Sequence, residues 1–205
     1  MDIQYVIEDE YKEHQSGHLR QCRQVKERFI LAGMGIWADG CHEPLHYEVA
    51  DSESEEHWKT LFKNLIARGF DPKQLKLVRS DGGLGIPGAI ATYFPNVKQQ
   101  RCITHKVRGI ERHMNYLDLP KLDDEQKTLK ATFLKDIKLA FTFYEFNPDL
   151  HHHIRTTNHL ERLFREFRTK SDEIGAFPNE TSCLTVFCLV VERDHAKHDR
   201  GKPRE

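Results

Sequence analysis

Apolar and polar residues follow a strand-like pattern in the first part of the chain. Val25–Trp37 is rich in β-branched and aromatic residues, and an Ala-Asp-Gly turn separates it from Leu45–Ala50. These two segments predict a hairpin. Because side chains alternate across a strand, Leu45, Tyr47 and Val49 are expected on one buried face of the second strand.

The pattern then changes to helical spacing. Acidic residues in Asp51–Glu56 precede an amphipathic segment that ends near Gly69. Its buried face is expected to consist of Trp58, Leu61, Phe62 and Leu65. A short apolar run, Leu75–Val78, predicts a strand that stops at an Asp-Gly-Gly turn, and Leu84–Tyr93 predicts a second helix.

A further strand and several helices are expected in the second half. Val97–Thr104 is typical of a short strand, and the stretch from His105 to about Tyr116 of a helix. Three more helices are predicted: one over Thr128–Phe143 with Leu129, Phe133, Ile137 and Phe141 on one stripe, one from Asn158 that buries Leu160, Leu163, Phe164 and Phe167, and one from Glu180 to about His195. The last is apolar on most faces, which predicts a central position. This order of elements favours an α/β domain with a mixed sheet.

Composition limits the class of protein. The chain has 205 residues, of which 38% are apolar, enough for one compact domain. Its net charge of -1 argues against a protein that simply coats nucleic acid, so any contact with nucleic acid must be local. The odd number of cysteines predicts reduced thiols and no disulfides. The apolar runs are too short to span a membrane, and the acidic start has no signal-peptide pattern, so a cytoplasmic chain is expected.

The first candidate for chemistry is Asp81, at the carboxyl end of a predicted strand, where open α/β sheets place ligands and catalytic groups. An equally good interpretation is that Asp81 caps the following helix. The nearby Gly82, Gly83 and Gly85 lack the spacing of a dinucleotide-binding loop and have no Gly-Lys-Ser/Thr ending. This argues against a nucleotide fold.

Cys102 and His105 form a Cys-x-x-His pair at a strand–helix junction, which could be half of a zinc site. The second half would have to come from the distant run His151–His153. Adjacent loop histidines are more often solvated, and packing of Cys102 against the sheet is the simpler interpretation.

The second candidate carboxylate is Glu161, on the helix that starts at Asn158. Arg165 follows it by four residues, so an ordinary surface ion pair is one interpretation. Basic residues cluster in two segments: Arg155, Arg162, Arg165, Arg168 and Lys170 in one, and Arg101, Lys106, Arg108 and Arg112 in the other. Carboxylates among basic residues suit a site that binds a polyanion and holds Mg²⁺ for phosphodiester chemistry.

Four motifs occur in an order that resembles one known family. DSESEEHW, LVRSDGGLGIPGAI, QQRCITHKVRG and IRTTNHLERLFREFRTKSDEIGAFPNE resemble, over most of the chain, the core of the Mutator-type transposases of bacterial insertion sequences. The resemblance implies a ribonuclease-H-like fold, with a mixed sheet flanked by helices, in which an Asp-Asp-Glu triad binds two Mg²⁺ or Mn²⁺ ions. It assigns Asp81 as the second acid, Glu161 as the third, and Cys102 and His105 as the motif between them.

The resemblance also implies the partners of the chain. Transposon-end and target DNA would be bound by Arg108, Arg155, Arg162, Arg165 and Arg168, with a homo-oligomer assembled on DNA in the bacterial nucleoid and no small-molecule cofactor. The catalytic core is expected over residues 1–196, with a shortened helical insertion at about 117–148 and a polar tail at 197–205.

One departure from the family pattern bears on activity. The chain begins with the stretch that normally follows the first acid, so that acid is expected upstream of Met1 and the fold is expected to be incomplete at its N-terminus. Asp2 and Asp9 lack the usual Asp-Gly setting. Two functions therefore stay open: a transposase that cleaves and joins DNA, and an inactive remnant that binds DNA or an intact transposase.

Overall fold

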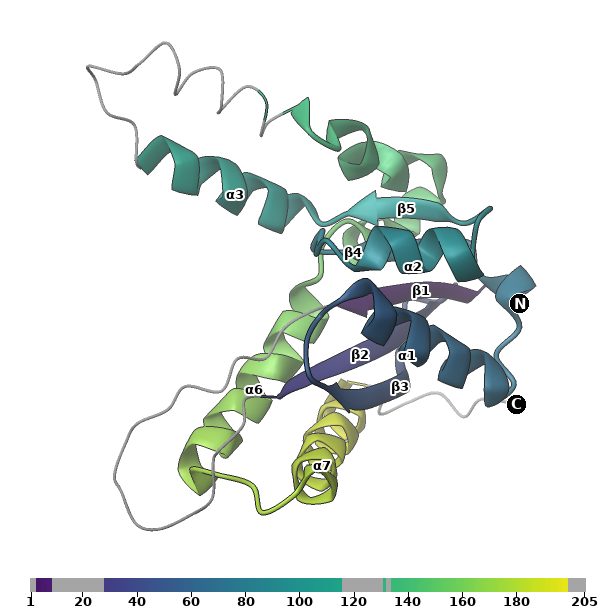
Figure 1. Ribbon diagram of the computed structural model, residues 1–205. Helices are drawn as coiled ribbons and strands as arrows, with labels where there is room; N and C mark the ends of the chain where they lie inside the picture. The colour runs from purple at the N-terminus through teal and green to yellow at the C-terminus, as the bar shows by residue number, and fades with distance from the viewer. Residues whose placement is uncertain (1–2, 9–27, 116–130, 132–133, 199–205) are drawn as a thin grey trace.

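A five-stranded mixed sheet forms the middle of the molecule (Figure 1). The computed structural model describes residues 3–8, 28–115, 131 and 134–198. The strands are β1 (Ile3–Glu8), β2 (Phe29–Trp37), β3 (His42–Ala50), β4 (Leu77–Ser80) and β5 (Lys98–Arg101). They lie in the order β3-β2-β1-β4-β5, with β1, β4 and β5 parallel and β2 antiparallel to both of its neighbours.

Helices connect and cover the strands. The α-helices are α1 (Glu55–Ala67), α2 (Ile86–Tyr93), α3 (Ile103–Asn115), α5 (His151–Ile154), α6 (Asn158–Ile174) and α7 (Glu180–His198). Short 3₁₀ segments are η1 (Pro72–Gln74), η3 (Ile137–Glu145) and η4 (Pro148–Leu150). The expected mixed α/β class is confirmed. In the described part of the chain, every helix is too short or too polar to span a bilayer.

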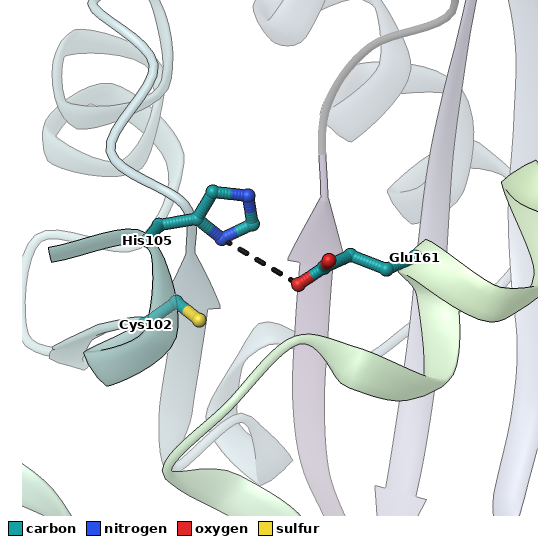
Figure 2. A group of neighbouring side chains, drawn as sticks. All are labelled: Cys102, His105 and Glu161. Atoms are coloured by element: carbon teal, nitrogen blue, oxygen red, sulfur yellow. Dashed lines mark ion pairs between the residues drawn. The ribbon is translucent and has the colours of Figure 1, made fainter. Parts of the chain in front are cut away.

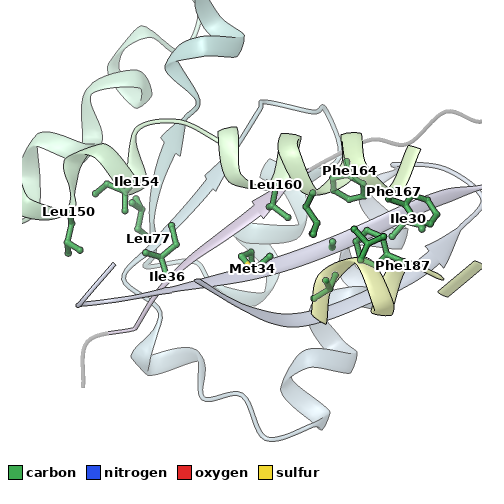
Figure 3. Packing of buried hydrophobic residues seen from close by; sticks show 14 of the residues in the cluster. Ile30, Met34, Ile36, Leu77, Leu150, Ile154, Leu160, Phe164, Phe167 and Phe187 are labelled. Atoms are coloured by element: carbon green, nitrogen blue, oxygen red, sulfur yellow. The ribbon is translucent and has the colours of Figure 1, made fainter. Parts of the chain in front are cut away.

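Two apolar clusters hold helices to opposite faces of the sheet. Leu31 and Val78 face α1 and α2, where Trp58 and Phe62 are completely buried. On the other face, Ile30 and Met34 pack against residues of α6 and α7 (Figure 3). This separation arises because neighbouring strand residues, such as Ile30 and Leu31, point to opposite faces. The result is a sheet between two helical layers.

The predicted hairpin is confirmed, but the face assigned to one residue is wrong. Tyr47 and Val49 pack in the cluster under α6 and α7, as expected, whereas Leu45 packs on the opposite side against the α1 and α2 cluster. The register of β2 and β3 shifts between Gly33 and Met34. Such a bulge adds one residue to β3 and reverses the alternation beyond it.

Helix α6 buries the four residues that its spacing predicts, Leu160, Leu163, Phe164 and Phe167. Helix α7, in contrast, is not central. It buries Phe187, Val190 and Val191 on one stripe, while 59% of Leu189 is exposed. Because Leu189 is apolar but lies on the outer side of α7, the buried stripe was hard to recognise from the sequence.

The helix predicted over Thr128–Phe143 also differs from the structure. Ile137–Glu145 is a 3₁₀ segment that buries Ala140, Thr142 and Phe143. Phe141 is 53% exposed because a 3₁₀ helix has three residues per turn, which rotates the buried stripe away from the α-helical positions. Leu129, Phe133 and half of the region expected to form the insertion lie outside the described residues.

Candidate active site

Asp81 begins the loop that follows β4, at the carboxyl end of the strand. Its Oδ1 accepts a hydrogen bond of 2.8 Å from the backbone N–H of Gly83, so the side chain orders the loop. Helix α2 has Gly85 at its N-cap and no side-chain capping bond, which makes the capping interpretation of Asp81 wrong. Gly82, between them, has φ of +99°, a conformation that favours glycine.

Glu161 lies in the first turn of α6, 19% exposed. Its Oε1 is 3.8 Å from Nδ1 of His105, which belongs to α3 (Figure 2). The negative charges of Asp81 and Glu161, which are far apart in the sequence, both raise the pKa of this imidazole.

Thr157 joins the Cys-x-x-His motif to the helix that carries Glu161. This residue is completely buried at the N-cap of α6. Its backbone N–H and its hydroxyl lie 3.3 and 3.0 Å from the sulfur of Cys102, and both donate to it. The same hydroxyl oxygen is 3.2 Å from Nδ1 of His105 and 3.4 Å from Oε1 of Glu161. Thr157 was not predicted as a site residue. A threonine next to a helix start indicates only a cap, so no sequence pattern pointed to its contact with Cys102.

The sulfur and the imidazole perturb each other's protonation. Burial raises the pKa of the Cys102 thiol, but hydrogen bonds from His105 and Thr157 outweigh burial and lower the pKa to about 7. The hydrogen bond with Cys102 raises the pKa of His105, burial opposes this shift, and the charges of Cys102, Asp81 and Glu161 add to it. A thiolate beside an imidazolium is therefore accessible near neutral pH.

Arg108, one turn beyond His105 on α3, provides the ion pair of Glu161. Its guanidinium donates to Oε2 of Glu161 at 2.7 Å. The hydrogen bond with Glu161 raises the pKa of Arg108, so the arginine stays charged. Glu161 thus has one oxygen on Arg108 and the other facing Thr157 and His105. The spacing of Glu161 and Arg165 had suggested an ion pair within one helix. The observed ion pair instead joins α6 to Arg108 of α3.

The remaining predicted DNA-binding arginines have different surroundings. Arg155, Arg165 and Arg168 are exposed, the last two along α6. Arg162 is directed toward α7, where it lies 3.4 Å from the buried carboxylate of Asp194. That contact partly neutralises its charge.

The histidine run does not complete a zinc site with Cys102 and His105. His153 packs near His42, with ring centroids 5.5 Å apart, and His151 packs against Phe143. In the described ranges, the one group of three or more potential metal ligands is Cys102, His105 and Glu161, with ligand atoms within 4.8 Å of one another.

The end of β1 also reaches this region. Tyr5 lies beside Val78 and Val6 beside Arg79 in the parallel ladder. Asp2 and Asp9, considered as substitutes for the first acid, lie outside the described residues.

Comparison with known proteins identifies the family of the chain. The profile of the transposase Mutator family matches residues 11–134 and 119–201, which together cover most of the chain and every site residue described above. The chain belongs to the Mutator family of transposases. The expected resemblance is therefore confirmed.

Individual Mutator family relatives are similar over nearly the same region. The transposase of insertion sequence ISRM5 from Rhizobium meliloti is 30% identical over 202 residues, covering 85% of this chain and 50% of the relative. The transposase of IS256 in transposon Tn4001 from Staphylococcus aureus is 28% identical over 206 residues, covering 84% and 51%. The chain spans about half the length of the curated relatives it matches.

Proposed function

We propose that this chain is the catalytic core of a transposase, which cleaves and joins DNA strands with the help of divalent metal ions. The observation that carries the proposal is the position of two carboxylates, Asp81 directly after β4 and Glu161 in the first turn of α6, whose charges both act on His105. Such carboxylates from separate elements are the ligands that Mg²⁺ or Mn²⁺ requires. Arginines on α3 and α6 surround them with positive charge.

A ribonuclease-H-like fold over residues 1–196 is part of this proposal. It is supported by the strand order β3-β2-β1-β4-β5, by the antiparallel β2 and by helices on both faces. A site at the carboxyl ends of the parallel strands agrees with the general position of sites in open α/β sheets.

The side chains fit a divalent ion in part. Asp81 and Glu161 would hold it, and bound there it would stabilise charge on the scissile phosphate. Arg108 would have to give up Oε2 of Glu161, which lies at a normal hydrogen-bond distance in the structure.

DNA is the proposed partner of the basic side chains. Arg108, Arg155, Arg165 and Arg168 are exposed and would contact phosphates, with a smaller contribution from the partly neutralised Arg162. Phosphate contacts of this kind give affinity that falls steeply as salt is raised. Assembly as a homo-oligomer on the DNA at the nucleoid is proposed together with this partner.

The test is strand transfer of a DNA fragment that carries the ends of the element encoding the chain, in Mg²⁺. Asp81→Asn and Glu161→Gln keep the side-chain size and remove the charge, so each should slow joining at least about a hundredfold, corresponding to about 2.7 kcal/mol. Glu166→Gln is a matched control on the same helix, where Glu166 faces Arg193 and Lys197. Normal rates for either site variant would refute the assignment.

A second candidate function, DNA binding without cleavage, is favoured by one observation. Arg108 already binds the carboxylate that the metal would need. This function predicts salt-sensitive binding of the same DNA with no strand joining by the unaltered chain. Joining that is lost in Asp81→Asn would exclude it.

A further inference from the structure

Cys102, His105 and Glu161 offer a thiol sulfur, an imidazole nitrogen and a carboxylate oxygen within 4.8 Å of one another (Figure 2). These three donors differ in kind from a pair of carboxylates. A thiolate and an imidazole select zinc-type ions, whereas Mg²⁺ prefers oxygen ligands. The group therefore has the composition of a softer metal site.

The distances are close to those of one tetrahedral ion. With zinc–ligand bonds of about 2.0 to 2.3 Å, two ligands of the same ion lie roughly 3 to 4 Å apart. Nδ1 of His105 and Oε1 of Glu161 are already 3.8 Å apart. For all three ligand atoms to reach one ion, the side chains would have to move by about an ångström. The hydrogen bond from the hydroxyl of Thr157 to the sulfur of Cys102 would then break.

The surroundings hold the ligands in place. Arg108 binds Oε2 of Glu161 and leaves Oε1 directed toward His105, so the arginine orients the carboxylate in the way that outer partners of metal ligands do. Cys102 is fully buried at the start of α3, and its N–H donates to the carbonyl of Ser80 at 2.8 Å. His105 and Glu161 remain 27% and 19% exposed, which gives an ion access from solvent.

We infer that Cys102, His105 and Glu161 form a binding site for one zinc-type ion, with water as the fourth ligand. This site shares Glu161 with the divalent-ion site proposed above. If that proposed function is correct, a bound zinc ion withdraws Glu161 from Mg²⁺ and inhibits strand joining. The metal site itself does not depend on catalysis.

Cobalt(II) is the probe, because it replaces zinc in tetrahedral sites and gives an absorption band when a thiolate binds it. The full chain, without a histidine tag and stripped with a chelator, is titrated with Co²⁺ and then with Zn²⁺. We expect one equivalent of Co²⁺ to produce the thiolate band, and one equivalent of Zn²⁺ to remove it.

Three variants make the result specific. Cys102→Ser should abolish the band, whereas Cys188→Ser, which alters a thiol on α7 next to Glu192, should leave it unchanged. Glu161→Gln keeps the thiol and should weaken Co²⁺ binding at least about tenfold. Mutation of a residue that only hydrogen-bonds to a metal ligand already costs about that much, and loss of a ligand should cost no less. Circular dichroism spectra check that each variant is folded.

Absence of a thiolate band in the folded, unaltered chain would overturn the inference, as would a band that survives in Cys102→Ser. Unchanged Co²⁺ affinity in Glu161→Gln would overturn the assignment of the third ligand. Because these readouts are spectroscopic, they are independent of strand joining. A chain that binds Co²⁺ as expected but, once stripped of it, joins no DNA in Mg²⁺ would contradict the proposed function and leave the metal site intact.

Discussion

Replacing Phe187 with alanine should destabilise the protein by about 4 kcal/mol. The Phe187 ring is completely buried and lies between α7, α6 and β3. Its centroid is 5.1 Å from that of Tyr47, 5.4 Å from Phe164 and 5.3 Å from Phe167. Phe→Ala changes in cores cost about 3 to 5 kcal/mol, and three aromatic neighbours favour the middle or upper part of that range.

The matched control is Leu189→Ala, on the same helix. Because Leu189 is 59% exposed, its loss should change the free energy of unfolding by less than about 0.5 kcal/mol. Both variants are measured by urea titration, with unfolding followed by fluorescence and circular dichroism. The reasoning assumes that α7 packs on the rest of the protein through one buried stripe that contains Phe187. Equal destabilisation of the two variants, or a loss of less than about 1 kcal/mol in Phe187→Ala, would refute it.

Three further predictions concern backbone conformation and protonation. Gly82→Ala should cost about 1 to 2 kcal/mol, because φ is +99° and the new methyl group would meet the guanidinium of Arg101; an unchanged melting temperature would contradict this. Gly109→Ala, in an open position on α3, should stabilise by about 0.5 to 1 kcal/mol in the same assay. Burial lowers the pKa of His42 from 6.5 to about 3, so the unfolded chain takes up a proton as pH falls below 6.5 and the folded chain does not. Stability should therefore fall by up to about 1.4 kcal/mol per pH unit between about pH 6 and 4, and His42→Gln should flatten that slope in urea titrations.

Sequence patterns predicted local elements well where one period dominated. The buried residues of α1 and α6 were identified because each helix has one apolar stripe of period 3.6. Leu45 and Phe141 were assigned to the wrong face, since a bulge and a 3₁₀ segment change the period without a clear sequence signal. Leu189 made α7 look central although it lies outside.

The candidate site was predicted in composition but not in its contacts. Asp81, Glu161, Cys102 and His105 were found from motif order, and the structure brings Cys102, His105 and Glu161 together. The roles of Thr157 and Arg108 depend on contacts between residues of α3 and residues at the start of α6. Thr157 is 52 residues from His105 in the sequence, and Arg108 is 53 residues from Glu161. No local pattern contains that information.

The position of Glu161 near the end of the fold has a consequence for protein synthesis. Chains fold from the N-terminus as they leave the ribosome. A nascent chain that has been made as far as η4 contains all five strands and Asp81, but neither Glu161 nor the α7 residues that hold α6 on the sheet. The proposed pair of acids is therefore complete only after α6 has been synthesised, and α6 is held on the sheet only once α7 follows. An incomplete chain, even one with a formed sheet, lacks this pair.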